Sequence, residues 1–181
     1  LQFAAERFHH PWRALQDLVS EGILPRVGIS ASFADEPRQL AARFSPAVIQ
    51  VPVSLFDQRL VCDGTLAELT ARGIEIHARS IFLQGLLFAT SDQLAASIRH
   101  IAPALEKRRN MIRDCGATLI GGAVGYVLSR PELRRIVIGV TDIGELKEIV
   151  AAATAAPVDI PWTDLAIEDA TVLNPSRWTA A

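Results

Sequence analysis

The segment IEIHARSIFLQGLL, residues 74–87, contains the pattern on which the fold prediction depends. Apolar residues recur at every second position over its first five residues, which is typical of a strand with one buried face. This strand ends in Arg79 and Ser80, and a turn with Gln84 and Gly85 follows. A guanidinium and a hydroxyl at the carboxyl end of a core strand predict a polar rim, which is where parallel α/β folds bind ligands.

Short runs rich in Val and Ile predict three more strands, and helical patterns separate them. The predicted strands cover residues 26–30, 48–54, 74–80 and 136–140. The predicted helices cover residues 11–22, 36–44, 64–73 and 143–154, and two more lie within 91–130 with a break near Gly116. Pro11 is expected in the first turn of its helix and Gly22 at its end. Strand–helix alternation with connections of this length implies parallel strands and an α/β fold.

Two closures of such a sheet stay open on this pattern. An open doubly wound sheet that binds a nucleotide has a GxGxxG turn after its first strand, whereas the first strand here is followed by ASFADEP. A (β/α)8 barrel has about 250 residues and eight strand–helix units. This chain has about four parallel strand–helix units, which would form a partial (β/α)8 TIM barrel.

The composition excludes several classes of function. The chain has 181 residues, 50% of them hydrophobic, and a formal net charge of -2. These values favour one globular domain over residues 1–181 and give no support for nucleic-acid binding. No apolar stretch is long enough to cross a membrane and no signal peptide is visible, so we expect a cytoplasmic protein without a membrane or metal partner. Cys62 and Cys115 have no CxxC spacing and are expected to be buried free thiols.

Polar groups accompany each of the four predicted strands. The first ends in Ser30, the second carries Gln50, the third ends in Arg79 and Ser80, and the fourth runs into Thr141. A serine at a strand end is often only a helix cap, but a buried amide such as that of Gln50 is costly without partners. Arg79 fits a structural ion pair and a ligand contact equally well. Together these residues predict a rim suited to an amide or a phosphate-bearing ligand.

The last unit turns a strand directly into a helix at GVTDIGELKE, residues 139–148. Free N–H groups and the helix dipole at such a helix start attract anions, which favours phosphate. The alternative is that Thr141 or Asp142 only caps the helix.

Five segments in this order resemble one known family. They are WRALQDLVSEGILPRVGIS (12–30), VIQVPVSLFDQRL (48–60), GIEIHARSIFLQGLL (73–87), YVLSRPELRRIVIGVTDIGELKEI (126–149) and NPSRW (174–178). Together they resemble the C-terminal half of an aldo-keto reductase, in a bacterial branch often found with polysaccharide biosynthesis genes. The resemblance implies a (β/α)8 barrel that binds NADP or NAD without a Rossmann fold. It also implies hydride transfer between this cofactor and a small carbonyl substrate.

The resemblance further implies which residues bind the cofactor. Ser30 and Gln50 match positions that bond the nicotinamide carboxamide, although Ala31 stands where the family has an asparagine. Arg79 falls where many members stack an aromatic ring on the nicotinamide, and a planar guanidinium can stack in the same way. The residues expected along the pyrophosphate are Ser80, Phe82, Leu83, Gln84 and Gly85, and those expected at the adenosine are Gly139, Val140, Thr141 and Glu148.

Two departures from the family concern the cofactor and the chemistry. Asp142 stands where many members have Lys or Arg for the 2′-phosphate of NADPH, so NADP, which is usual in the family, and NAD both stay open. The family's catalytic Asp, Tyr and Lys come from its first three strand–helix units, which have no match in this sequence. Tyr126 is the only tyrosine and is expected in the core. His9 or His10 is the candidate for the family histidine that ends the fourth strand.

Two hypotheses follow for the chain as a whole. It is either the cofactor-binding half of a reductase, N-terminally truncated before Leu1, or a non-catalytic half barrel that binds a nucleotide or serves only in assembly. A half barrel exposes two strand edges and an inner face that we expect to be apolar. The expected macromolecular partners are therefore a second copy of the chain, forming a homo-oligomer, or a separate N-terminal half.

Overall fold

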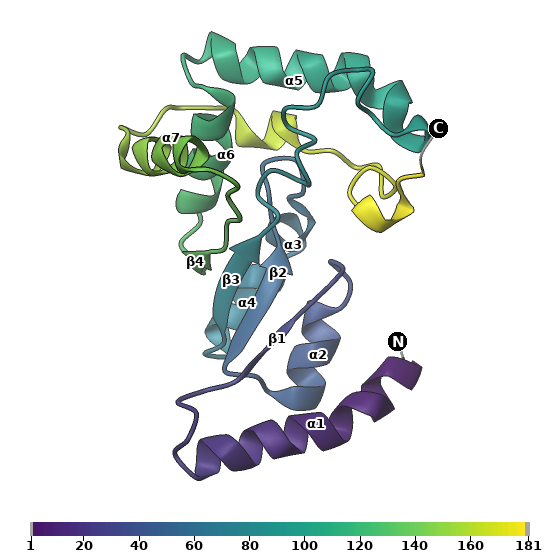
Figure 1. The fold of residues 1–181 in the computed structure, drawn as a ribbon, viewed down its shortest axis with the longest axis vertical. Coiled ribbons are helices and arrows are strands. Elements are labelled where there is room, and N and C mark those ends of the chain that lie inside the picture. The colour runs from purple at the N-terminus through teal and green to yellow at the C-terminus, as the bar shows by residue number, and fades with distance from the viewer. Residues whose placement is uncertain (1, 180–181) are drawn as a thin grey trace.

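The computed structural model describes residues 2–179 and contains one sheet of four parallel strands (Figure 1). The strands are β1 (Gly28–Ser30), β2 (Val48–Pro52), β3 (Glu75–Arg79) and β4 (Leu133–Ile136), in the spatial order β1-β2-β3-β4. Each neighbouring pair is parallel, and at least one helix separates successive strands. The predicted α/β fold is confirmed, and its four strand–helix units have the arrangement of half a (β/α)8 barrel.

Helices precede, separate and follow the strands. They are α1 (Gln2–Ser20), α2 (Pro37–Phe44), α3 (Arg59–Cys62), α4 (Thr65–Ala71), α5 (Ala102–Asp114), α6 (Leu119–Leu128) and α7 (Ile143–Thr154), and the 3-10 turns are η1 (Ala96–Ile101), η2 (Trp162–Leu165) and η3 (Pro175–Arg177). The break predicted near Gly116 separates α5 from α6, and Gly116 has a φ of 81°. None of the helices described in residues 2–179 is both long and apolar enough to cross a membrane.

The prediction for the fourth strand is wrong, because β4 is the polar run LRRI and not the apolar run 136–140. β4 is an edge strand, where polar side chains stay in water, and Nε of Arg135 lies 3.5 Å from Oε1 of Glu75 on β3. The N–H of Val137 donates to the carbonyl oxygen of Ala78 over 2.7 Å, and the chain then leaves the sheet. At an edge, apolar content is a poor guide to the residues that pair.

Helix α1 begins well before the predicted start, so Pro11 lies inside the helix and not in its first turn. A proline removes one N–H donor from a helix, and Pro11 does so on the exposed side of α1. The next residue, Trp12, is buried against Phe44 of α2, with ring centroids 5.6 Å apart. This contact fixes α1 against α2. The predicted end of α1 is confirmed, since Gly22 follows it with a φ of 74°.

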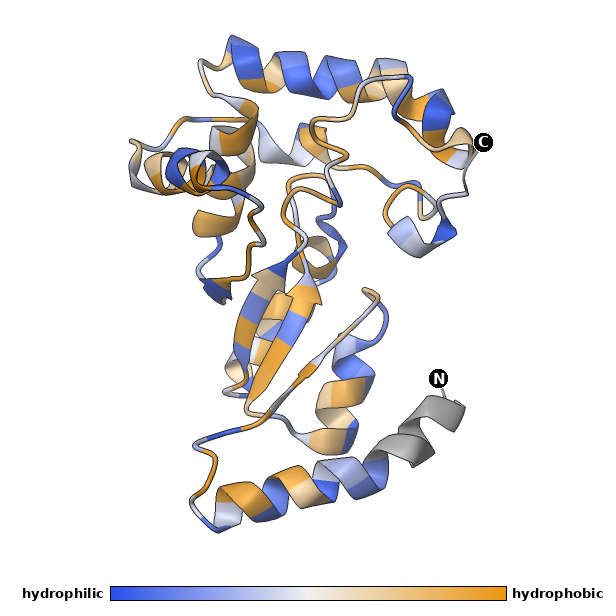
Figure 2. Ribbon diagram, viewed as in Figure 1, coloured by the Kyte–Doolittle hydropathy of each residue, from blue (hydrophilic) through white to orange (hydrophobic). Residues whose placement is uncertain are grey.

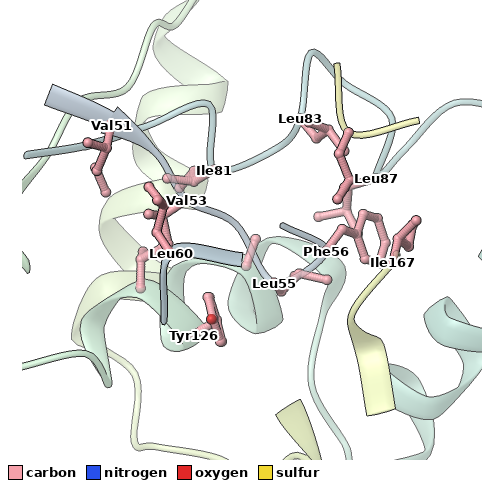
Figure 3. Packing of buried hydrophobic residues seen from close by; sticks show 14 of the residues in the cluster. Val51, Val53, Leu55, Phe56, Leu60, Ile81, Leu83, Leu87, Tyr126 and Ile167 are labelled. Atoms are coloured by element: carbon pink, nitrogen blue, oxygen red, sulfur yellow. The ribbon is translucent and has the colours of Figure 1, made fainter. Parts of the chain in front are cut away.

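One face of the sheet is apolar and packs against helices. The buried strand residues on this face are Ile49, Val51, Ile76 and Ala78. They join a core cluster that includes Ala41 of α2 and Leu66 and Leu69 of α4. Figure 3 shows part of the same cluster, from Val51 through Val53 to Leu60 and Tyr126. The core therefore lies between the sheet and its helices and continues through the loops after β2 and β3 to α5 and α6.

The other face of the sheet carries the polar residues of the strands. The register and the alternation of the strands place Ser30, Gln50, Glu75, His77 and Arg79 on it. Figure 2 shows hydrophobic and hydrophilic residues alternating along β3, whereas β2 is mostly hydrophobic. The expectation of an apolar inner face is therefore wrong for most of this side, because the buried apolar residues face the helices and polar residues predominate on the open side, although Val48 and Pro52 of β2 also lie there.

The cysteines are free thiols, as predicted, but neither is fully buried: Cys115 is half-buried and Cys62 is exposed. It is the last residue of the short helix α3, where the chain turns toward Asp63 in solvent. Within residues 2–179, no group of three His, Cys, Asp or Glu side chains is arranged to hold a metal ion.

Candidate functional site

The carboxyl ends of β1 and β2 bring two predicted site residues together on the polar face. Ser30 and Gln50 are partners in the parallel register, and Oγ of Ser30 donates to Oε1 of Gln50 over 3.1 Å. Nε2 of Gln50 makes no hydrogen bond to any other described residue, so it is a donor that a ligand can use. The pair therefore presents an amide N–H and a hydroxyl oxygen side by side.

Arg79, the last residue of β3, extends across the same rim. Its Nη2 donates to the carbonyl oxygens of Ala31 at 2.7 Å and Ser32 at 3.3 Å, and its Nη1 donates to Oγ of Ser80 at 3.0 Å. Among the described residues, no carboxylate lies within ion-pair distance of it. The structural ion pair that the sequence left open is therefore not formed, and the charge of Arg79 is held at the rim by neutral carbonyls.

The loop after β3 has an unusual backbone. Ser80, Leu83, Gln84 and Gly85 have φ values of 58°, 47°, 53° and 79°. For a residue with a side chain, this left-handed region costs about 1–2 kcal/mol. Such strain persists where the surroundings impose it and is common at ligand-binding sites. The sequence predicts only the glycine turn and not the three non-glycine residues in this conformation.

Packing within the loop explains how the strained backbone is held. Leu83 is buried in the core, and the ring of Phe82 packs on that of Phe88 with centroids 5.5 Å apart. Gln84 is exposed. A Cβ added to Gly85 would meet nothing within 4 Å, so the main chain is open to close approach at this residue.

The residues predicted at the adenosine lie on the segment after β4 and on α7. Gly139, Val140, Thr141 and Glu148 are all exposed. No hydrogen bond among the described residues joins them to Ser30, Gln50 or Arg79. The structure thus links Ser30 with Gln50 and Arg79 with Ser80 by hydrogen bonds, but it leaves the four residues predicted at the adenosine outside these contacts.

Two carboxylates occupy the start of α7. Oδ1 of Asp142 accepts from the N–H groups of Gly144 at 2.6 Å and Glu145 at 3.0 Å, and Oε2 of Glu145 accepts from the N–H of Thr141 at 2.6 Å. The alternative that Asp142 caps the helix is therefore correct. These acceptors use N–H groups that would otherwise attract an anion, so the helix start gives little support for phosphate binding.

Glu75 and His77 form a polar cluster further down the open face, which the sequence analysis missed. Nε2 of His77 lies 2.7 Å from Oε1 of Glu75, Arg26 also hydrogen-bonds this carboxylate, and Arg135 lies beside it. The hydrogen bond from Arg26, followed by that from His77, lowers the pKa of Glu75 to about 2. The available signal was the two-residue spacing that puts Glu75 and His77 on the same face as Arg79.

The catalytic candidates lie away from the rim. His9 and His10 are exposed residues within α1 and do not end a strand. Nε of Arg43 donates to Nε2 of His9 over 3.2 Å, and the His9 ring lies 5.7 Å from that of Phe44, so His9 is held against α2.

Tyr126 is in the core, as predicted from the sequence. Its side chain is fully buried, and its ring lies edge-on to Trp162 with centroids 5.6 Å apart. Burial raises the pKa of Tyr126, and its hydroxyl has no hydrogen-bond partner among the described residues. A hydroxyl in this position cannot exchange a proton with a ligand at the rim.

Comparisons with known proteins agree with this architecture. The model of the aldo/keto reductase family matches residues 2–161. Among solved structures, the holo form of the aldo-keto reductase AKR11C1 from Bacillus halodurans superposes with a TM-score of 0.68 and 20% identity over 81% of this chain and 50% of that chain. For the apo form of the same protein the TM-score is 0.69 and the identity 19%, over 84% of this chain and 54% of that chain.

A thermostable aldo-keto reductase, Tm1743, in complex with the inhibitor epalrestat is also similar. Its TM-score is 0.58 and its identity 16%, over 90% of this chain and 52% of that chain. The chain thus spans about half the length of the solved structures it matches. At these identities the likeness shows the fold alone. No curated protein matches the sequence.

Proposed function

This chain belongs to the aldo/keto reductase family, and we propose that it provides the cofactor-binding side of an NAD(P)H-linked carbonyl reductase. A bound nicotinamide dinucleotide would supply the hydride that reduces the carbonyl. The chain's own residues would bind and orient this cofactor at the carboxyl ends of β1, β2 and β3. The observation that carries the proposal is the hydrogen bond between Ser30 and Gln50.

The Ser30–Gln50 pair fits the chemistry of a nicotinamide carboxamide. Because Oε1 of Gln50 already accepts from Ser30, its Nε2 is left to donate to the carboxamide oxygen. The oxygen of Ser30 has a free lone pair that can accept from the carboxamide NH2. A ligand amide bonded at both ends avoids the cost of a buried polar group without a partner.

Arg79 and Gly85 support a dinucleotide at the same rim. The guanidinium of Arg79 is anchored by main-chain carbonyls, so its charge stays available to an anionic ligand. We propose that its plane lies against the nicotinamide ring. The open space at Gly85 would allow the pyrophosphate to approach the main chain.

The proposal is tested by titrating the purified chain with NADH and NADPH while following cofactor fluorescence. Gln50→Ala is expected to weaken binding by about 1–3 kcal/mol, which is roughly 5- to 150-fold in Kd. Gln39→Ala, which removes an exposed amide on α2 instead, is the matched control and should leave the Kd unchanged. Equal affinities for the parent chain and Gln50→Ala would refute the carboxamide assignment.

The same proposal makes a claim about turnover. With Tyr126 buried, the proton for the reduced carbonyl would have to come from a group outside the described rim. We therefore propose that this chain alone binds the cofactor without oxidising it. Oxidation of NADH or NADPH by the chain with an aldehyde would contradict this division of roles.

A second candidate function, an assembly module, is favoured by the surface of α7. Ile143, Leu146 and Val150 recur at helical spacing and are 72%, 46% and 53% exposed. They lie on the helix that follows β4, and the outer edge of β4 has no partner strand among the described residues. Exposed apolar side chains beside a free strand edge are typical of an interface.

The topology favours a complementary half barrel over a second copy as the partner. In a (β/α)8 barrel each helix covers the groove between two adjacent strands. This chain has α1 before β1 and α7 after β4, so in chain order a helix flanks each of the two outer strands. Two copies closed into one barrel would bring two helices to each shared groove. A partner with four strands and only the three helices between them would leave one helix for every groove.

Light scattering coupled to size-exclusion chromatography of the purified chain distinguishes these partners. A dimer would indicate a second copy, and a monomer would agree with a separate complementary half. Leu146→Lys should abolish any association through α7, whereas Ala151→Lys, on another face of the same helix, should leave it unchanged. A symmetric dimer that persists in Leu146→Lys would argue against α7 as the interface.

A further inference from the structure

Arg109 of α5 is a buried charge whose hydrogen bonds go mainly to the backbone of a distant segment. The residue is 7% exposed. Its Nε donates to the carbonyl oxygen of Leu87 at 2.9 Å, and its Nη2 donates to those of Leu86 at 3.0 Å and Ala89 at 2.5 Å. One guanidinium therefore satisfies three carbonyls in four consecutive residues.

The segment that Arg109 binds continues directly from the left-handed turn after β3. The N–H of Leu86 donates to the carbonyl of Leu83, and the N–H of Phe88 donates to that of Gly85, so the turn and the segment form one hydrogen-bonded loop. Leu86 and Leu87 are fully buried, and their carbonyls need partners away from water. Arg109 provides those partners from a different element.

A carboxylate holds the guanidinium of Arg109 in place. Its Nη1 donates to Oε2 of Glu106, one turn earlier on α5, at 3.0 Å, and Oε1 of Glu106 accepts from Arg113 at 2.8 Å. The planar fork of an arginine can serve several acceptors in fixed directions, which the single ammonium of a lysine cannot. The directions of the three loop carbonyls are thus set by α5.

The neighbouring residue Arg108 makes the same kind of contact with another segment. Its Nε donates to the carbonyl oxygen of Leu165 at 3.0 Å and its Nη2 to that of Ala166 at 2.7 Å. These carbonyls belong to η2 and the residue after it, and not to the loop. Arg108 is therefore an internal control for the loss of an arginine from α5.

We propose that Arg109 is a positioning residue, which holds the loop of residues 80–89 in the conformation that binds the cofactor pyrophosphate. The proposal rests on the proposed function in one respect, that this loop contacts a dinucleotide. Its other part, that Arg109 sets the shape of the loop, is independent of any ligand. Preorganisation of a binding loop raises affinity by reducing the entropy lost on binding.

Three variants test the proposal in the full chain: Arg109→Ala, Arg109→Lys and Arg108→Ala. Amide hydrogen exchange of peptides covering 80–89, urea unfolding midpoints and Kd values for NADH and NADPH are measured for each. Arg109→Ala should accelerate exchange in the loop and weaken cofactor binding about tenfold. Arg109→Lys should give exchange rates and Kd values between those of the parent chain and Arg109→Ala. If Arg109→Ala does not fold, the comparison is made with Arg109→Lys alone. Arg108→Ala should destabilise the chain without changing the loop exchange or the Kd.

The outcomes separate the two parts of the proposal. Unchanged loop exchange in Arg109→Lys and Arg109→Ala overturns it, and so does an equal rise in Kd for Arg108→Ala, since the effect would then follow from general loosening of α5. Faster loop exchange with an unchanged Kd overturns the link to the cofactor. If the parent chain binds neither NADH nor NADPH, the proposed function fails, and the exchange measurement alone decides whether Arg109 shapes the loop.

Discussion

Ser30 and Gln50 lie opposite each other on β1 and β2, and the hydroxyl of Ser30 donates to the amide oxygen of Gln50 over 3.1 Å. The serine therefore fixes which end of the amide faces a ligand. An amide with a free choice of orientation would present its donor only part of the time. The two residues act as one unit, and this has a measurable consequence.

The first prediction is that Ser30→Ala and Gln50→Ala are not additive. Ser30→Ala should weaken NADH binding by about 0.5–1.5 kcal/mol, because Gln50 loses the partner that orients it. The double variant should be weaker than Gln50→Ala by less than this amount, with a coupling energy of about 0.5–1.5 kcal/mol. Fluorescence titration of the parent chain, the two single variants and the double variant with NADH gives the four affinities of this double-mutant cycle. Strict additivity would mean that the hydrogen bond does not orient the amide. Ser32→Ala, at an exposed position in the next loop, is the control.

The second prediction concerns the choice between NADH and NADPH. Asp142 and Glu145 place two carboxylates at the start of α7, near where the resemblance to the family puts the adenosine. We expect NADH to bind more tightly than NADPH, since these charges repel a 2′-phosphate.

Neutral substitutions test this discrimination directly. Asp142→Asn keeps a capping residue, and with Glu145→Gln it should improve the NADPH affinity relative to NADH by about 0.3–1 kcal/mol per charge. Asp17→Asn on α1 is the control. A preference for NADH that is unchanged in the double variant would place the adenosine elsewhere.

The sequence predicts best the elements that bury one face. The runs that became β2 and β3 alternate between buried and half-buried positions, so their periodicity reports burial. The apolar pattern does not predict β4, because Arg134 and Arg135 can stay in water at the edge of the sheet. Pro11 misplaces the start of α1 because the helix continues through the proline despite the loss of one N–H donor.

The positions of candidate residues on strands were predictable, whereas contacts between distant elements were not. Ser30 and Gln50 follow from strand ends and register. The three carbonyls bound by Arg109 have no sequence signature, because a hydrogen bond to the main chain does not depend on the identity of the residue that accepts it. The left-handed backbone at Leu83 and Gln84 also could not be predicted from the sequence, because tertiary packing imposes it on residues that rarely adopt it.

The third prediction is a pH dependence of stability that comes from Glu75. Its pKa is lowered from 4.5 to about 2 by Arg26 first and then by His77. Because the folded-state value is depressed, the stabilisation is fully present above the ordinary pKa and is lost as the pH falls toward 2. The difference in melting temperature between the parent chain and Glu75→Gln should therefore be largest above about pH 5 and shrink on acidification.

Melting curves between neutral pH and pH 3 measure this difference. Glu21→Gln, which removes an exposed carboxylate without a side-chain partner among the described residues, should show no such narrowing. A difference that stays constant with pH would mean that the charge of Glu75 does not contribute.

The fourth prediction is that stability and binding change in opposite directions in the loop after β3. Gln84 is exposed and has a φ of 53°, so Gln84→Gly removes strain without removing packing. It should raise the free energy of unfolding by about 0.5–1 kcal/mol. The same substitution frees the backbone of the proposed pyrophosphate loop, so cofactor binding should weaken.

Substitution of the adjacent residue should change the stability in the opposite direction. Gly85 has a φ of 79° with open space where a Cβ would lie, so Gly85→Ala adds backbone strain without a steric clash. It should lower the free energy of unfolding by about 1–2 kcal/mol. Urea unfolding and cofactor titration of the two variants measure both quantities. A Gln84→Gly chain that is less stable than the parent, or one that binds the cofactor more tightly, would show that the strained backbone is not maintained for binding. The expected pattern is instead that the loop keeps an unfavourable conformation because the ligand requires it.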